Sequence, residues 1–225
     1  MCGFVGYFAL DKINASITLK NSVKLLRHRG PDDSGQLISK NIGLGSTRLS
    51  IQDLSSRSRM PMESKNKRYV IVFNGEIYNF KELREEILKK GIELTTTSDT
   101  EVLLTMYQLY REKSLNYLNG MFSFAILDKK NKSIFLARDR FGIKPLYFYK
   151  SNRLILFASE IKAFIPFVKK FNLKWEISNK IISEYMIFRY NSGCNTLIRN
   201  VYRCLPGQFL SINQMGKIKK YSYYE

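Results

Sequence analysis

The chain of 225 residues is long enough for one large domain or two small ones, and its 44% hydrophobic content is typical of a packed globular core. No apolar run approaches the roughly 18 residues that a membrane helix needs. The N-terminus also lacks the basic-then-apolar layout of a signal peptide. No membrane span is therefore expected.

A net charge of +18, from 37 basic and 19 acidic residues, raises the question of a nucleic-acid partner. The lysines are scattered through every predicted element, and the short clusters, such as Lys217 to Lys220, lie in turns or near the end. No long basic helix, zinc-ligand spacing or RNA-binding aromatic motif accompanies them. The charge is interpreted as a solvated basic surface, and no nucleic-acid partner is expected.

The cysteines are Cys2, Cys194 and Cys204, an odd number without metal-ligand spacing. They are interpreted as free thiols in a reducing compartment, which predicts a cytoplasmic protein and no metal site.

The first half of the chain mixes strands and helices. Strands are predicted at residues 3–10, 37–38, 42–48 and 69–73, and a helix at 17–29; residues 52–68 are expected to form a polar loop. Asn79 with Glu82 and Ser98 with Glu101 predict the N-terminal caps of two further helices. Asp99 then falls in a first helical turn, where the helix dipole should keep its carboxylate ionised.

Short β-rich runs dominate from residue 121 onward. Strands are predicted at residues 121–127, 133–138, 146–149, 154–158 and 209–212, and helices at 160–165 and from Ser178 to Phe188. Helices between two groups of strands indicate an α+β domain of packed sheets with helices outside. The periodicity leaves the strand order open.

Cys2 lies one residue from the start of the chain. If Met1 is removed, Cys2 becomes the N-terminal residue and carries both a nucleophile and a base. Its thiolate attacks, and an α-amine with an ordinary pKa of about 7.7–8.0 can accept the thiol proton near neutral pH. The alternative is that Cys2 is a small apolar residue that opens the first strand.

Further polar groups lie at strand ends and helix starts, where functional sites usually form. They are Arg48 at the end of a strand, Asn74-Gly75-Glu76 after a strand, Asp99 at a helix start, and Arg27 to Asp32 after a helix. An amino-acid amide as substrate would give them a common purpose. An Asn amide and a following Gly N–H can stabilise an oxyanion, an Arg can hold a carboxylate, and acidic side chains can hold an ammonium group.

Six motifs cover nearly the whole chain in a fixed order. They are Met1-Cys2-Gly3, Arg27 to Asp32 (RHRGPD), Arg48 to Ile51 (RLSI), Asn74 to Asn79 (NGEIYN), Ser98 to Glu101 (SDTE) and Arg138 to Tyr147 (RDRFGIKPLY). Together they resemble the class II glutamine amidotransferases, and most closely the N-terminal glutaminase domain of glutamine-hydrolysing asparagine synthetases. RHRGPD and NGEIYN indicate this branch, because related sugar-aminating and purine-pathway amidotransferases carry different versions of both.

The resemblance implies the N-terminal-nucleophile hydrolase fold, with two antiparallel β-sheets sandwiched between α-helices. It implies that Cys2 attacks the side-chain amide of L-glutamine with its own α-amine as base, while Asn74 and the Gly75 N–H form the oxyanion hole. The implied substrate-binding residues are Arg48 for the α-carboxylate, Ile51 through its backbone, and Glu76 with Asp99 for the α-ammonium group. His28 and the two later cysteines are not part of this set.

A complete asparagine synthetase continues into an ATP-pyrophosphatase domain with a Ser-Gly-Gly-x-Asp-Ser type phosphate loop, and this chain contains no such sequence. Residues 2–210 are therefore predicted to form the glutaminase domain, and residues 211–225 the start of a linker. No cofactor is predicted in this chain; ATP and Mg²⁺ are implied only for the absent synthetase domain or subunit, the expected ammonia acceptor. The resemblance also allows a homodimer.

Two alternatives stay open. The ammonia acceptor can be another molecule, such as a sugar carboxylate, because acceptor specificity lies in the missing half. The chain can also be a truncated, non-catalytic glutamine-binding module, a state that retention of Met1 would produce by blocking the amine.

Overall fold

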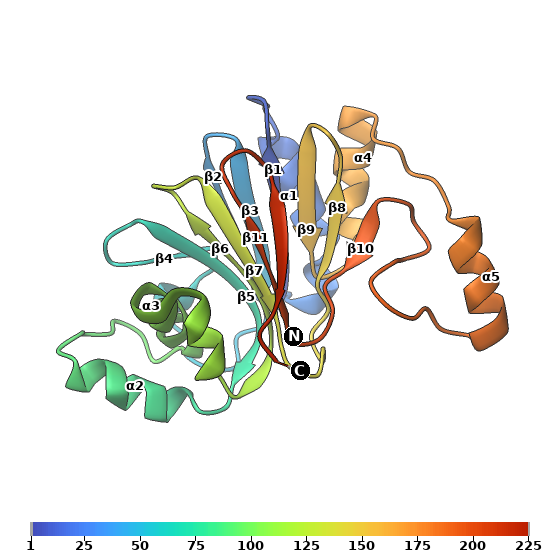
Figure 1. The fold of residues 1–225 in the computed structure, drawn as a ribbon. Helices are drawn as coiled ribbons and strands as arrows, with labels where there is room; N and C mark the ends of the chain where they lie inside the picture. The colour runs from blue at the N-terminus through green and yellow to red at the C-terminus, as the bar shows by residue number, and fades with distance from the viewer. Residues whose placement is uncertain (1, 225) are drawn as a thin grey trace.

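The computed structural model describes residues 2–224, which form two six-stranded antiparallel sheets packed face to face (Figure 1). The first sheet has the order β10 (Val201–Arg203), β8 (Tyr147–Lys150), β9 (Leu154–Ala158), β1 (Gly3–Ala9), β3 (Ile42–Arg48) and β2 (Asp33–Ser39). The second has the order β12 (Ile218–Ser222), β11 (Gln208–Ile212), β7 (Ser133–Arg138), β6 (Gly120–Asp128), β5 (Tyr69–Ile77) and β4 (Met62–Glu63).

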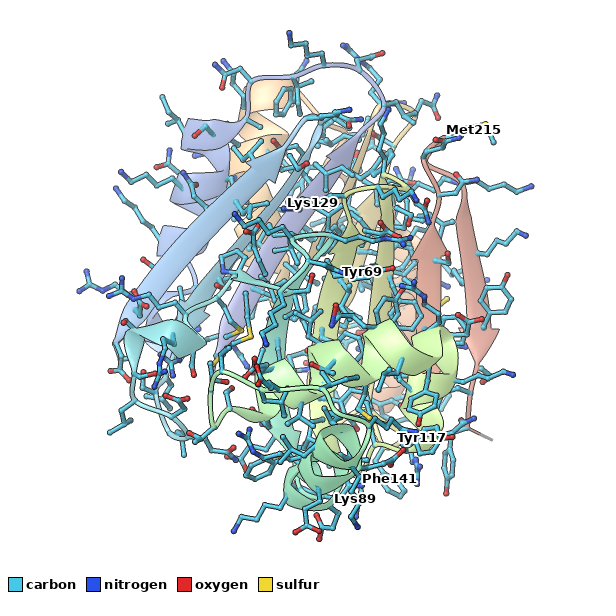
Figure 2. The ribbon with its side chains drawn as sticks, turned by 90° about the vertical axis from the view of Figure 1, so that its left-hand side faces the viewer. Tyr69, Lys89, Tyr117, Lys129, Phe141 and Met215 are labelled. Atoms are coloured by element: carbon cyan, nitrogen blue, oxygen red, sulfur yellow. The ribbon has the colours of Figure 1, made fainter. Side chains whose placement is uncertain are left out.

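Helices cover the outer faces of both sheets, which confirms the predicted α+β class. The helices α1 (Ser16–Lys24) and α4 (Ile165–Phe171) pack on the first sheet, and α2 (Phe80–Lys89) and α3 (Asp99–Tyr110) on the second. Figure 2 shows α2 and α3 lying across the second sheet, and Figure 1 shows α5 (Asn179–Phe188) standing apart from both. Short 3-10 turns lie at Arg27–Arg29, Ser56–Ser58, Arg111–Asn116 and Ile161–Phe164.

The central strands are apolar on both faces because each sheet is covered on two sides. Strand β5 illustrates the pattern: Val70 and Val72 point between the sheets, whereas Ile71 and Phe73 pack toward α2 and α3. The same alternation produces three apolar layers, one between the sheets and one under each helical layer. Burial of these layers is the main favourable contribution to folding.

The predicted helix caps are correct in position but not always in chemistry. Ser98 accepts a hydrogen bond from the Thr100 N–H at 3.1 Å, as a cap should. Asn79 holds the cap position of α2 without capping it. Its side chain instead accepts from the Asn119 N–H and donates to the Tyr117 carbonyl, both at 2.9 Å, because the turn before β6 packs against this end of α2.

Strand β5 is longer than predicted. It continues through Asn74, Gly75 and Glu76 to Ile77, since these residues pair with residues 120–123 of β6. The expectation that Asn74 to Glu76 follow the strand is therefore wrong. The short strands β4, β10 and β12 were not predicted either, and β12 pairs with β11, so the segment 211–224 lies largely in an edge hairpin.

No helix within residues 2–224 is both long and apolar enough to cross a membrane.

Candidate active site

A cavity of about 170 Å³ lies at the end of the sandwich where β1 begins and where β3 and β5 end. Its walls also include the start of α3, the start of β6 and the loop after β7. All seven residues that the sequence predicts as catalytic or substrate-binding line it: Cys2, Arg48, Ile51, Asn74, Gly75, Glu76 and Asp99. These residues are up to 97 positions apart along the chain, so the strand order is what brings them together.

The cavity forms here because the inward-facing side chains change character at this end of the sheets. In β5, Val70 and Val72 belong to the apolar layer between the sheets, and the next residue on that face is Asn74. In β3, Ile42 and Leu44 occupy the same layer, and the inward-facing series continues to Arg48. The apolar sandwich therefore ends in a polar layer that borders the cavity.

Cys2 is half-buried and directly precedes the first residue of β1. Its thiol donates a weak hydrogen bond to the Leu49 carbonyl, with 3.8 Å between sulfur and oxygen. Burial raises the pKa of the Cys2 thiol above its ordinary value, and the nearby Arg48 charge opposes this rise only in part. Cys2 therefore rests as a neutral thiol that needs a base to become a nucleophile.

The backbone at Cys2 is held by the RHRGPD segment. Arg29 donates through Nε to the Cys2 carbonyl at 2.9 Å and through a second nitrogen to Glu160 at 2.8 Å. Asp32 accepts from the Ser50 N–H at 2.8 Å, which ties the same segment to the loop after β3. The motif thus positions the site, and none of its residues lines the cavity.

Asn74 has a fully buried side chain at the cavity wall, with 0% of its surface exposed. Neither its Nδ2 nor its Oδ1 has a hydrogen-bond partner among residues 2–224. Buried amides are nearly always paired, since an unpaired one costs about 1–3 kcal/mol. Such an orphaned amide beside a thiol is suited to a ligand that brings its own acceptor.

The Gly75 N–H faces the same cavity. Opposite residues in an antiparallel ladder alternate between exchanging hydrogen bonds and not exchanging them. Gly75 lies opposite Phe122, whose N–H and carbonyl both bond to Asp139 on the far side, at 3.2 and 2.8 Å. The Gly75 N–H therefore points away from β6, along the edge where the Ile77 N–H meets the Asp99 carboxylate.

Asp99 and Glu76 form the acidic wall of the cavity. Asp99 is only 5% exposed, and burial raises its pKa to about 6, with the Glu76 charge adding to the rise. The helix dipole was expected to govern this carboxylate, but its contribution of about 0.3–1 kcal/mol is smaller than the cost of desolvation. Asp99 is ionised at pH 7, as expected, yet it takes up a proton in the mildly acidic range.

Arg48, the last residue of β3, holds the following loop, which contains Ile51 and closes one side of the cavity. The buried Arg48 guanidinium donates to the Ser55 carbonyl at 3.3 Å, to the Gln52 carbonyl at 3.4 Å and to the Asp53 carbonyl. Ile51 is exposed at the rim. The Asp53 carboxylate accepts from the Thr97 N–H at 2.8 Å, so the loop is also tied to the residues before α3.

Lys144 is the charged cavity residue that the sequence analysis did not single out. It is 5% exposed and lines the cavity together with Ser58, Met60 and Met121. Its place inside the RDRFGIKPLY motif was the available signal, but the motif alone does not show which of its residues faces the cavity.

The remaining candidates lie elsewhere. His28 is exposed and pairs with Glu160 at 2.9 Å, outside the cavity lining. Cys194 and Cys204 are free thiols away from it, and Cys204 is buried. Met1, whose removal would free the Cys2 amine, is outside the described residues. Within residues 2–224, no three His, Cys, Asp or Glu side chains gather closely enough to hold a metal ion.

Comparison with known proteins identifies close relatives of this chain. Residues 1–224 match the family described as a glutamine amidotransferase domain. Asparagine synthetase (glutamine-hydrolysing) 1 of Bacillus subtilis strain 168 is 38% identical over 229 residues, which cover 100% of this chain and 35% of that protein. A putative asparagine synthetase (glutamine-hydrolysing) 2 of Methanocaldococcus jannaschii is 34% identical over 244 residues, covering 100% of this chain and 47% of that protein.

The solved structure of a glutamine phosphoribosylpyrophosphate amidotransferase from Bacillus subtilis, complexed with ADP and GMP, matches 98% of this chain and 49% of that one. Its TM-score is 0.72 at 19% sequence identity, a likeness that shows the shared N-terminal-nucleophile hydrolase fold. The chain thus spans between a third and a half of the length of these relatives. It belongs to the class II glutamine amidotransferases and corresponds to the amidotransferase domain of glutamine-hydrolysing asparagine synthetases.

Proposed function

We propose that this chain hydrolyses L-glutamine to L-glutamate and ammonia, with Cys2 as the nucleophile. One observation carries the proposal: the Cys2 thiol shares a cavity with the fully buried Asn74 amide, whose polar atoms have no partner in residues 2–224. An oxyanion formed at Cys2 would accept a hydrogen bond from that amide and from the Gly75 N–H. Donors of this kind, fixed before the reaction, stabilise the transition state of acyl transfer.

Substrate binding follows from the charges on the cavity walls. The cavity lining includes Arg48, which is suited to the α-carboxylate of glutamine, and Glu76 and Asp99, which are suited to its α-ammonium group. Ile51 lies on the loop at the rim, where its backbone would help position the substrate. A substrate held at both charged ends places its side-chain amide near the thiol, which lowers the entropic part of the barrier.

The chemical steps use the Cys2 α-amine, freed by removal of Met1, as the base. The amine accepts the thiol proton while the sulfur bonds to the amide carbon, and the carbonyl oxygen becomes an oxyanion held by Asn74 and Gly75. The protonated amine then passes its proton to the leaving nitrogen, and the C–N bond breaks to release ammonia and leave a thioester. Water, deprotonated by the same amine, hydrolyses the thioester to glutamate and restores Cys2.

The test is glutamate release from L-glutamine by the wild-type chain, Cys2→Ala and Cys194→Ala. We expect Cys2→Ala to lose activity and Cys194→Ala to retain it, because Cys194 lies outside the cavity. Equal rates for wild type and Cys2→Ala would disprove the nucleophile. Intact mass on the same sample shows whether Met1 has been removed; a chain that retains Met1, binds glutamine and does not turn over would instead be the non-catalytic module.

We also propose that the ammonia passes to a synthetase domain or subunit that activates aspartate with ATP and Mg²⁺. The support is that the curated relatives named above are asparagine synthetases two to three times the length of this chain. The genomic reading frame after codon 225 and its neighbours test this. An ATP-pyrophosphatase sequence there would support aspartate as acceptor, whereas a sugar-modifying enzyme would point to a different one.

A further inference from the structure

The proposed mechanism leaves one buried charge of the cavity without a role. Lys144 lines the same cavity as Cys2 and Glu76, and only 5% of its surface is exposed. Lysines are rarely buried to this extent, and those that are buried beside reactive groups are candidates for a functional role.

The backbone of Lys144 is held from both sides by its own motif. The Asp139 carboxylate, which is fully buried, accepts from the Lys144 N–H and from the Ile143 N–H, both at 2.9 Å. Arg138 donates to the Lys144 carbonyl at 2.7 Å and to the Gly142 carbonyl at 2.6 Å. The loop is therefore a rigid support for the side chain of Lys144.

The loop also fixes the direction of that side chain. Phe141 and Ile143 are exposed, and Figure 2 shows Phe141 at the lower end of the molecule, level with α2. Lys144, next to Ile143, is turned into the cavity. Neighbouring residues of this short loop therefore differ in exposure: Phe141 and Ile143 are exposed, and Lys144 is buried. The hydrogen bonds that hold the backbone of Lys144 account for this difference.

The charged and titratable groups that act on Lys144 come from several elements. They are Arg29 from the RHRGPD segment, Glu76 from β5, Asp139 from its own loop and Cys2 from the start of β1. Burial lowers the pKa of Lys144, and the Arg29 charge adds to this, whereas Glu76, Asp139 and Cys2 oppose it. Lys144 and Cys2 line the same partly desolvated cavity, where charge interactions are stronger than in water. Arg48, which favours the Cys2 thiolate, and Asp99, which opposes it, also act on the thiol.

We propose that Lys144 is a positioning residue for the reaction, whose ammonium group stabilises the negative charge that forms on the Cys2 sulfur. The inference rests on the proposed function, in which Cys2 must become a thiolate. In this role Lys144 acts through its charge and transfers no proton. The competing role is that of a structural counter-ion for Glu76 and Asp139, which would leave the ionisation of Cys2 unaffected.

The experiment measures the rate at which iodoacetamide alkylates Cys2 as a function of pH, read by mass spectrometry of the Cys2 peptide. The variants are Lys144→Met, which removes the charge at similar length, Lys144→Arg, which keeps it, and Lys150→Met, an exposed matched control at the end of β8. The rate of Cys194 alkylation in the same molecules serves as the internal reference for the concentration and reactivity of iodoacetamide. We expect the pH midpoint at Cys2 to rise by about one unit in Lys144→Met and to stay unchanged in the other two.

An unchanged midpoint in folded Lys144→Met would overturn the proposal in favour of the counter-ion role. If Lys144→Met does not fold, Lys144→Gln replaces it, with the same expected shift. In turnover, kcat at pH 7 should fall roughly tenfold with KM unchanged, because one pH unit is a tenfold change in thiolate. A higher KM with unchanged kcat would contradict the proposal. Alkylation does not need glutamine turnover. If Lys144→Met shows the expected shift of the Cys2 midpoint while the wild-type chain shows no glutaminase activity, the proposed function alone is refuted.

Discussion

The Asp99 carboxylate accepts a hydrogen bond from the Ile77 N–H at 3.1 Å. This bond joins the first turn of α3 to the strand that carries Asn74 and Gly75. The group proposed to bind the glutamine ammonium is thereby fixed relative to the groups proposed to bind the oxyanion. The groups proposed to bind the two ends of glutamine are therefore both positioned by the same strand, β5.

Replacing Asp99 by Asn should stabilise the protein while weakening substrate binding. Burial raises the pKa of Asp99 from its ordinary 3.8 to about 6, so the folded state binds a proton more tightly than the unfolded state does. The wild-type free energy of unfolding should therefore fall as pH rises from about 4 to about 6, by up to about 3 kcal/mol. Asp99→Asn removes this loss, and urea unfolding at pH 5 and pH 8 checks it.

The same substitution should raise the KM for glutamine, because the neutral amide cannot hold an ammonium group as a carboxylate does. In the wild type, KM should rise as pH falls through about 6, and in Asp99→Asn this dependence should disappear. A variant that is less stable than wild type at pH 8, or that keeps the acidic KM rise, would contradict this account of Asp99.

Asn74→Ala should lower kcat by about 10²–10³-fold, the typical cost of losing one oxyanion donor. Its melting temperature should change little, because the Asn74 amide has no hydrogen bond within residues 2–224 to lose. The matched control is Asn79→Ala, which loses two bonds of 2.9 Å. The control should cost about 1 kcal/mol of stability and leave kcat unchanged; the reverse pattern would refute the assignment.

Gly75→Ala should destabilise the fold by roughly 1–3 kcal/mol or more through overpacking. A Cβ at Gly75 would lie 2.2 Å from the Met121 carbonyl oxygen and 2.7 Å from the Phe122 Cα, so β5 and β6 would have to separate. Gly91→Ala is the comparison, since its Cβ meets nothing within 4 Å and only its φ of +76° is unfavourable. Equilibrium unfolding of both variants should show the larger loss at Gly75.

Arg48→Lys should raise KM by about tenfold or more, because an ammonium cannot reproduce the planar fork that holds a carboxylate and several carbonyls at once. The loop whose carbonyls at Gln52, Asp53 and Ser55 accept from Arg48 should also exchange its amide hydrogens faster. Arg57→Lys, an exposed arginine in the turn Ser56–Ser58, is the control. Unchanged exchange in Arg48→Lys would show that the loop is held by other contacts.

Glutaminase activity should be unaffected by EDTA, because the proposed chemistry uses a thiol, an amine and backbone and amide donors only. The measurement compares glutamate release before and after dialysis against the chelator. A loss of activity that Mg²⁺ or Zn²⁺ restores would contradict a metal-free mechanism.

Much of the site could be predicted from the sequence, because the types of its residues and their local positions indicate their chemical roles. A cysteine beside the chain start, an Asn-Gly pair after an apolar run and an Asp after a Ser cap each have a chemical role that the local sequence can indicate. The family motifs then join these pieces, and all seven proposed residues line one cavity. The strands of the core were also predictable, since short continuous apolar runs bounded by turn residues are typical of strands that are buried on both faces.

The remaining features depended on contacts between distant segments. Pairing with β6 decided that Asn74 to Glu76 belong to β5, and the turn before β6 took the Asn79 side chain away from its helix. Burial raised the pKa of Asp99 against the helix dipole. The clamp by Arg138 and Asp139 turned Lys144 inward. Desolvation and cross-strand hydrogen bonding depend on which surfaces meet in space, so only the tertiary structure determined them, whereas the sequence by itself had determined which chemical groups would be there to meet.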